Sequence, residues 1–170
     1  MNIVWNRGLR AGICGATLIV FAHGPIDAAT PRNAPDLVLQ QADGTAVRLS
    51  TYKGKVVLVD FWASWCVPCK ASFPALDKIY REYRDRGVQV LAVNLDEERK
   101  NADAFLSARP HEMPVLFDAK GNAPIAFGVK GMPTSFLIDR TGAIRFTHMG
   151  YTSNVDLSYR QEIAQLLSER

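Results

Sequence analysis

The sequence has few metal-binding side chains and no concentrated block of positive charge. Its three histidines, His23, His111 and His148, lie far apart, and its only closely spaced cysteines are Cys66 and Cys69. A structural zinc site needs four ligands, usually in two close pairs, so the sequence does not predict a metal centre. The formal net charge of +3 is spread along the chain. A nucleic-acid partner or an anionic membrane surface is therefore not expected.

Low-complexity tracts and internal repeats are also missing from the sequence. Its 170 residues are 48% hydrophobic and 22% charged, which is typical of one globular domain with a proper core. A chain of this size buries enough surface to fold without disulfides. The cysteines are therefore expected to have a role other than stabilising a small core by a disulfide.

No apolar run is long enough to predict a transmembrane helix. Two arginines precede a mostly apolar run of 12 residues, 11–22, and small residues follow near Ala29. This order is typical of a secretory signal, and a spanning helix needs about 20 apolar residues. We expect residues 1–29 to be a signal peptide or, as the alternative, an uncleaved anchor in the inner membrane. The protein is then expected in the periplasm, where disulfides persist.

The third cysteine, Cys14, lies inside this apolar run, so cleavage of the signal would remove it. A lipid-modified cysteine is expected to follow a small residue, and Ile13 occupies that position. Residues 30–35 contain prolines with polar neighbours and are predicted to be a linker. The folded domain is predicted to cover residues 36–170.

Within this domain, apolar runs alternate with helical patterns, which predicts an α/β fold with a mixed sheet. A hairpin is expected within 36–50, and further strands at 55–62, 88–95, 114–118, 134–139 and 143–150. Helices are expected at 67–86, 97–108, 123–127 and near the C-terminus. Pro74 is expected to kink the first helix, and Asp96 to cap the second.

The pair Cys66 and Cys69 follows a buried strand and opens a helix, an arrangement that makes a thiol reactive. Unpaired N–H groups and the helix dipole favour negative charge at a helix N-terminus. Such positions and Cys-X-X-Cys motifs lower the thiol pKa from about 8.5 to about 3.5 to 7.5. We expect Cys66 to attack a substrate disulfide and the more buried Cys69 to resolve the mixed disulfide. An inert disulfide closing so short a loop would add little stability.

Two separate motifs resemble the thioredoxin fold: "VVLVDFWASWCVPCK" at 56–70 and "GMPTSFLID" at 131–139. The leading hairpin, "VNLDEE" and "PVLFDAKGNAPIAFGVKGMPTSFLIDRTGAI" narrow the resemblance to the TlpA, ResA and CcmG (DsbE-like) group of thiol–disulfide oxidoreductases. The resemblance covers residues 36–150. It implies a thioredoxin-like fold in which helices flank a central mixed sheet, with an N-terminal β-hairpin extension and a central insertion.

By this resemblance Cys66 is the nucleophile, Cys69 the resolving thiol and Pro133 a cis-proline beside them. A cis X–Pro bond costs only about 0.5 to 1 kcal/mol, and it would leave the backbone of Met132 free to pair with an extended substrate segment. A trans-proline that merely ends a loop is the alternative. Trp65 is expected to contact the sulfurs and substrates, or else only to pack.

The resemblance to thioredoxins also implies that Asp60 accepts and returns the proton of Cys69. Burial on a strand beneath the cysteines would raise the pKa of this carboxyl and suit it to that task. The alternative is a strand-end aspartate that bonds to nearby backbone. Some members of the group carry a glutamate where this chain has Ser72, so their specialised pKa tuning does not transfer.

The residues around the sulfurs are expected to modulate the redox potential. Val67 and Pro68 lie between the cysteines and bias the potential in a direction that the sequence does not give. Lys70 either stabilises a thiolate or is a solvated charge on the helix. No cofactor is expected.

The resemblance implies an exported, monomeric protein-disulfide reductase whose clients belong to cytochrome c or copper-site assembly. A membrane thiol carrier of the DsbD or CcdA type would recharge it. An oxidant of the same fold is equally compatible with the motif. A peroxidase would need threonine where Ala63 stands, and a copper-delivery protein would space its cysteines by three residues and add a histidine such as His111 or His148.

Overall fold

A computed structural model describes residues 32–152 and 154–169, which belong to one compact unit. The strands are β1 (Val38–Gln40), β2 (Ala46–Arg48), β3 (Val56–Trp62), β4 (Val88–Asn94), β5 (Val115–Phe117), β6 (Thr134–Ile138) and β7 (Ile144–Met149). The helices are α1 (Val67–Tyr83), α2 (Arg99–Ser107), α3 (Asn122–Phe127) and α4 (Val155–Ser168). Short 3-10 turns cover Leu49–Tyr52 and Arg84–Arg86.

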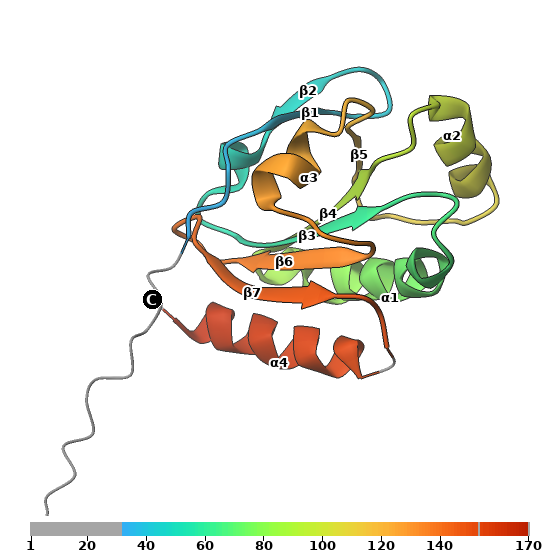
Figure 1. Cartoon of the computed structure of the whole chain (residues 1–170). Coiled ribbons are helices and arrows are strands. Elements are labelled where there is room, and N and C mark those ends of the chain that lie inside the picture. The colour runs from blue at the N-terminus through green and yellow to red at the C-terminus, as the bar shows by residue number, and fades with distance from the viewer. Residues whose placement is uncertain (1–31, 153, 170) are drawn as a thin grey trace, which may run out of the picture. The chain divides into compact units, whose positions relative to one another are not determined.

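The strands form one mixed sheet in the order β2-β1-β5-β4-β3-β6-β7 (Figure 1). β3, β4 and β5 are parallel to one another, whereas β6 is antiparallel to β3, and β7 to β6. The hairpin β1–β2 adds to the edge at β5. The predicted mixed sheet and N-terminal hairpin are confirmed, and the segment between β4 and β6 contains α2, β5 and α3.

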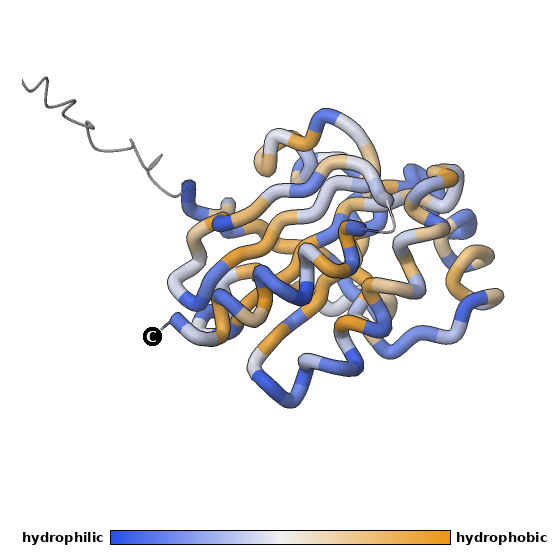
Figure 2. The backbone as a smooth tube through the Cα atoms, turned by 90° about the horizontal axis from the view of Figure 1, so that it is seen from below, coloured by the Kyte–Doolittle hydropathy of each residue, from blue (hydrophilic) through white to orange (hydrophobic). Residues whose placement is uncertain are grey.

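The two central strands are buried along their whole length, which explains their continuous apolar sequence. All seven residues of β3 and all seven of β4 are buried, as expected for strands covered on both faces. Helices α1 and α4 cover one face and α3 the other (Figure 1). Hydrophilic and hydrophobic residues alternate along the helices (Figure 2), so each helix directs one side to the sheet.

The first helix ends earlier than predicted. Pro74 lies inside it at an exposed position, and the expected kink stays a prediction. The helix ends at Tyr83, three residues early, and the chain continues as the 3-10 turn Arg84–Arg86. Gly87 then turns the chain with a φ of 87°, a conformation that glycine adopts without steric cost.

The predicted cap at Asp96 is wrong. α2 begins at Arg99 after Glu98, which makes no side-chain cap. Asp96 instead accepts hydrogen bonds from the N–H and the hydroxyl of Ser64, at 2.9 and 2.8 Å, and from the side chain of Asn94 at 2.7 Å. These donors lie beyond the ends of two adjacent parallel strands, so the carboxylate joins the loop after β3 to the end of β4.

The described part of the predicted linker is bound to the domain. Asn33 forms a bridge with Ala143, and backbone bonds of 2.8 Å flank it, from Ala34 to Gly142 and from Ile144 to Arg32. The signal or anchor predicted for residues 1–29, with Cys14, lies outside the described residues. Among the described residues, no helix combines the length and apolar character that crossing a membrane requires.

Candidate active site

Cys66 and Cys69 form a disulfide with their Cα atoms 5.3 Å apart. Cys66 is the N-cap of α1, and its Sγ accepts a hydrogen bond from the N–H of Cys69 at 3.3 Å. This donor belongs to the unpaired N–H groups of the helix start. We expect this N–H to stabilise the thiolate of Cys66 in the reduced protein.

The two sulfurs are unequally placed. Cys69 is completely buried, whereas Cys66 is 4% exposed and lies at the wall of an open, mainly apolar groove. This substrate groove is lined by Trp65, Cys66, Val67, Pro68, Leu95, Val129, Gly131 and Met132. Trp65 and Val67 are 65% and 74% exposed. The groove therefore brings together the two motifs that the sequence singled out.

Three lining residues were missed by the sequence reasoning. Leu95 follows the last residue of β4, and Val129 and Gly131 precede the proline loop. Leu95 lies next to the redox loop because its N–H donates to the carbonyl of Trp62 at 2.9 Å. The sequence contained a signal for Leu95, because the apolar run at 88–95 was expected to include it.

The peptide bond between Met132 and Pro133 is cis, as predicted. Pro133 is buried, and its carbonyl accepts a bond from the N–H of Gly150 at 2.8 Å. Within the described residues, the backbone N–H and carbonyl of Met132 make no hydrogen bond. Both groups therefore remain available beside the groove, and their part in substrate binding stays a prediction.

Asp60 lies at the middle of β3 and is 1% exposed. Burial raises the pKa of its carboxyl from 3.8 to about 7, although a hydrogen bond from Ser135 acts in the opposite direction. The hydroxyl of Ser135 donates to Oδ1 at 2.6 Å, while Oδ2 has no partner within the described residues. The expected rise is confirmed, and the hydrogen-bond partner is a side chain rather than nearby backbone.

Ser135 and Tyr159 complete this buried polar cluster and were missed by the sequence reasoning. The Oγ of Ser135 lies 2.6 Å from the hydroxyl of Tyr159. Burial, and after it the charge of Asp60, raises the pKa of Tyr159. A serine within the apolar strand "TSFLID" was the only hint in the sequence. Its meaning depends on the strand pairing, because β6 places Ser135 opposite Asp60.

The remaining predicted modulators lie in the first turns of α1. Val67 and Pro68 are exposed along the groove. Lys70 is also exposed, and its side chain makes no hydrogen bond or ion pair within the described part of the chain. Ser72 is buried, and its hydroxyl donates to the carbonyl of Cys69 at 3.1 Å, so it helps to hold the turn that contains the resolving cysteine.

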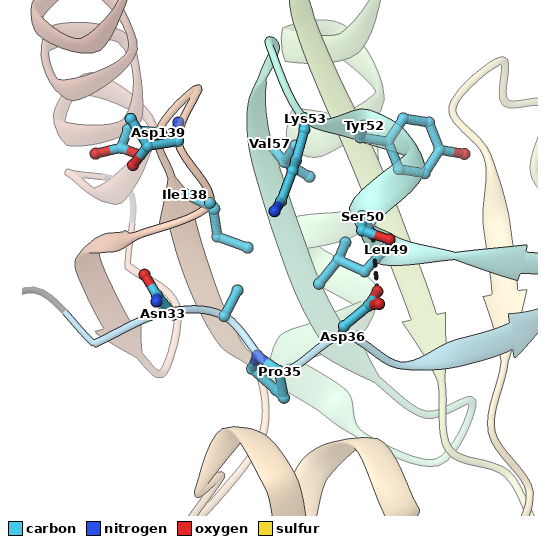
Figure 3. A pocket seen from close by; sticks show the side chains of 13 residues that line it. Asn33, Pro35, Asp36, Leu49, Ser50, Tyr52, Lys53, Val57, Ile138 and Asp139 are labelled. Carbon is cyan, nitrogen blue, oxygen red and sulfur yellow. Dashed lines mark hydrogen bonds between the residues drawn. The ribbon is translucent and has the colours of Figure 1, made fainter.

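A second pocket of about 220 Å³ lies at the ends of β3 and β6 that are farther from the proline loop (Figure 3). Val57 and Ile138 line it and pair with each other, whereas the other end of the same ladder pairs Phe61 with Thr134 beside the proline loop. Neither cysteine of the disulfide lines this pocket. The substrate groove is therefore the candidate active site.

Candidate metal ligands do not gather anywhere in residues 32–152 and 154–169. The Nδ1 of His111 lies 2.9 Å from the carbonyl of Arg109. The Nε2 of His148 lies 2.7 Å from a carboxylate oxygen of Glu162. Each of these imidazoles therefore has a protein partner.

The first cysteine of a Cys-X-X-Cys disulfide caps a helix, and a cis-proline loop lies across the groove from it. These features define a thiol–disulfide oxidoreductase of the thioredoxin fold. The sequence comparison narrows this class. Residues 29–163 match the Redoxin family, and the chain belongs to that family.

Three similar proteins are thiol–disulfide exchange proteins or thioredoxins by name. The thiol-disulfide oxidoreductase ResA of Geobacillus thermodenitrificans is 35% identical over 129 residues, which are 76% of this chain and 74% of the relative. A solved structure from Chlorobium tepidum, assigned as a thiol:disulfide interchange protein DsbE, has a TM-score of 0.78 and 45% identity over 81% of this chain and 97% of its own. The exposed lipoprotein thioredoxin Etrx1 of Streptococcus pneumoniae has a TM-score of 0.68 and 33% identity over 78% and 100%.

Proposed function

We propose that this oxidoreductase is exported to the periplasm and reduces disulfides of particular client proteins through Cys66 and Cys69. The unequal placement of the two sulfurs supports the roles of the two cysteines in this exchange. Cys66 borders an open groove and accepts a backbone N–H, whereas Cys69 is enclosed. A client can reach one sulfur, and the other can react only within the protein.

The first step joins the client to the enzyme through a mixed disulfide. The thiolate of Cys66 attacks one sulfur of the client disulfide, which forms a mixed disulfide and releases the second client sulfur as a thiolate. An extended client segment lies in the substrate groove during this step. Its backbone pairs with the free groups of Met132, and its apolar side chains contact Trp65.

The second step releases the reduced client. Cys69 loses its proton to Asp60, and the resulting thiolate attacks the Sγ of Cys66. The internal disulfide forms, the client leaves as a second thiolate, and two electrons have passed from enzyme to client. A carboxyl with a pKa of about 7 suits this transfer, since an efficient general base has a pKa near the working pH.

The protein is then returned to its dithiol form by a membrane thiol carrier of the DsbD or CcdA type. The similarity to proteins named ResA and DsbE supports this direction. We propose cytochrome c or copper-site assembly factors as the clients. An uncleaved segment 11–22 would keep the enzyme at the inner membrane, close to such a carrier.

A Cys69→Ser variant tests the proposal in the native compartment. It cannot resolve the mixed disulfide, so clients should accumulate in covalent complexes that a reductant releases. A Cys66→Ser variant is the matched control, because its remaining thiol is buried and should trap far less. Equal trapping by the two variants would contradict the assigned roles, and trapped clients can be identified by mass spectrometry.

A further inference from the structure

Three polar residues lie in a row across the sheet. Asp60 on β3 pairs with Ser135 on β6, and Ser135 pairs with His148 on β7. Directly opposed residues of antiparallel strands point to the same face. Helix α4 packs against this face through Tyr159 and Ile163. The row therefore lies between the sheet and α4.

When Asp60 is ionised, the hydrogen bonds in this cluster run in one direction. Ser135 has a single hydroxyl proton, and its Oγ donates to Oδ1 of Asp60 at 2.6 Å. The contact of 2.6 Å between Ser135 and Tyr159 must then be a bond that Tyr159 donates. The chain runs from Tyr159 to Ser135 to Asp60, and all three residues are buried, so bulk water does not compete with it.

The two hydroxyl groups fit the charged form of the carboxylate better than its neutral form. An ionised Asp60 accepts the chain as it stands, and the donation from Tyr159 strengthens the donation from Ser135. A proton on Oδ1 would reverse the chain and leave the hydroxyl of Tyr159 to find a new acceptor. A proton on Oδ2 meets no acceptor among the described residues. Burial opposes the charge, and the hydrogen bond from Ser135 partly offsets that cost.

We propose that Ser135 and Tyr159 are positioning residues of the redox reaction, whose hydroxyl chain stabilises charged Asp60 and so sets the pH at which this carboxyl changes its protonation state. The inference rests on the proposed role of Asp60 as the base for Cys69. Both residues act through Asp60.

Other titratable groups surround the chain and belong in the test. His148 on β7 contacts the ring of Tyr159 edge-on, with the ring centroids 5.0 Å apart, and pairs with Glu162 of α4. The charge of Asp156 on α4 also raises the pKa of Tyr159. On the other side of Asp60, β4 places the apolar Ala92 opposite it. The thiols of α1 add charge only after reduction, so the oxidised protein isolates the hydroxyl chain from them.

The test is an NMR titration of the Asp60 carboxyl in the full-length oxidised protein with ¹³C-labelled aspartate. Ser135→Ala removes the direct donor and should raise the pKa of Asp60 by about one unit, a tenfold change in proton affinity. Tyr159→Phe should raise it less, and Ser135→Thr, which keeps a hydroxyl, should leave it near the wild-type value. His148→Gln is the control for the neighbouring hydrogen-bonded pair His148–Glu162 and should have the smallest effect.

The pH profile of thiol exchange in the reduced protein provides the second readout. Ser135→Ala should move it to higher pH in the wild-type background but not in Asp60→Asn. An unchanged Asp60 pKa in folded Ser135→Ala, or an equal shift of the profile in both backgrounds, would overturn the inference. A raised Asp60 pKa in Ser135→Ala supports the hydroxyl chain, and if Asp60→Asn then leaves the profile unmoved, the proposed proton transfer fails instead.

Discussion

The carboxylate of Asp96 holds Ser64 by two hydrogen bonds, to its N–H and to its hydroxyl. Ser64 lies two residues before Cys66 in the loop that leaves β3. The carboxylate is buried and also accepts a bond from Asn94. One side chain at the end of β4 therefore fixes the loop that presents Trp65 and Cys66 to the groove.

We predict that Asp96→Ala destabilises the protein by about 1 to 3 kcal/mol, because it leaves buried donors without an acceptor. The variant should also react more slowly with protein disulfides, since the loop before Cys66 loses its anchor. Urea unfolding and stopped-flow thiol exchange measure the two effects. Asp85→Ala is the control, because Asp85 is 92% exposed, and the account fails if the two variants behave alike.

The buried carboxyl of Asp60 predicts a pH-dependent stability. Its folded pKa of about 7 exceeds the ordinary 3.8, so the folded state binds more protons than the unfolded state between these values. The free energy of unfolding therefore falls as the pH rises from about 4 to about 7, by up to about 4 kcal/mol.

Asp60→Asn removes this dependence. The oxidised variant should be more stable than the wild type at pH 8, and the difference should shrink as the pH approaches 4. Urea denaturation at the two pH values measures it. A difference that is the same at both would show that Asp60 has an ordinary pKa in the folded protein.

Exposed Trp65 is expected to serve binding rather than folding. Trp65→Ala should change the free energy of unfolding by less than about 0.5 kcal/mol, as surface substitutions usually do, but raise KM for a protein disulfide several-fold. A small disulfide, which does not fill the groove, should be reduced at nearly the wild-type rate. The matched control is Leu157→Ala, which removes an exposed apolar side chain on α4 and should leave KM unchanged.

Asp77 provides a test that separates stability from redox chemistry. This buried carboxylate on α1 accepts bonds from the N–H groups of Glu112 and Met113, at 2.7 and 2.9 Å. Asp77→Ala should cost about 2 to 4 kcal/mol, because two backbone donors lose a charged acceptor. The redox potential of the cysteine pair should stay at the wild-type value, and a large change would contradict the separation.

Local patterns predicted most of the fold. The valine-rich runs of β3 and β4 and the apolar stripe of α1 reflect burial that is visible in the sequence itself. The partner of Asp96 depended on contacts between distant segments, which no local pattern contains. Asp96 is an example: a cap for the next helix was a sound local expectation, but donors from the loop after β3 compete for the same carboxylate.

The active site divides in the same way. Cys66, Cys69 and Pro133 belong to contiguous motifs and could be recognised directly. Ser135 and Tyr159 could not, because their relation to Asp60 arises only when β6 pairs with β3 and α4 packs across them. A hydroxyl within an apolar strand has no evident role until its cross-strand neighbour is known.

The direction of electron flow is the central claim, and the equilibrium redox potential of the Cys66–Cys69 pair tests it most directly. The reductase proposal predicts a potential close to the value of about −270 mV that is typical of thioredoxin. A value near about −120 mV, typical of the oxidant DsbA, would contradict it and assign the protein to disulfide formation instead.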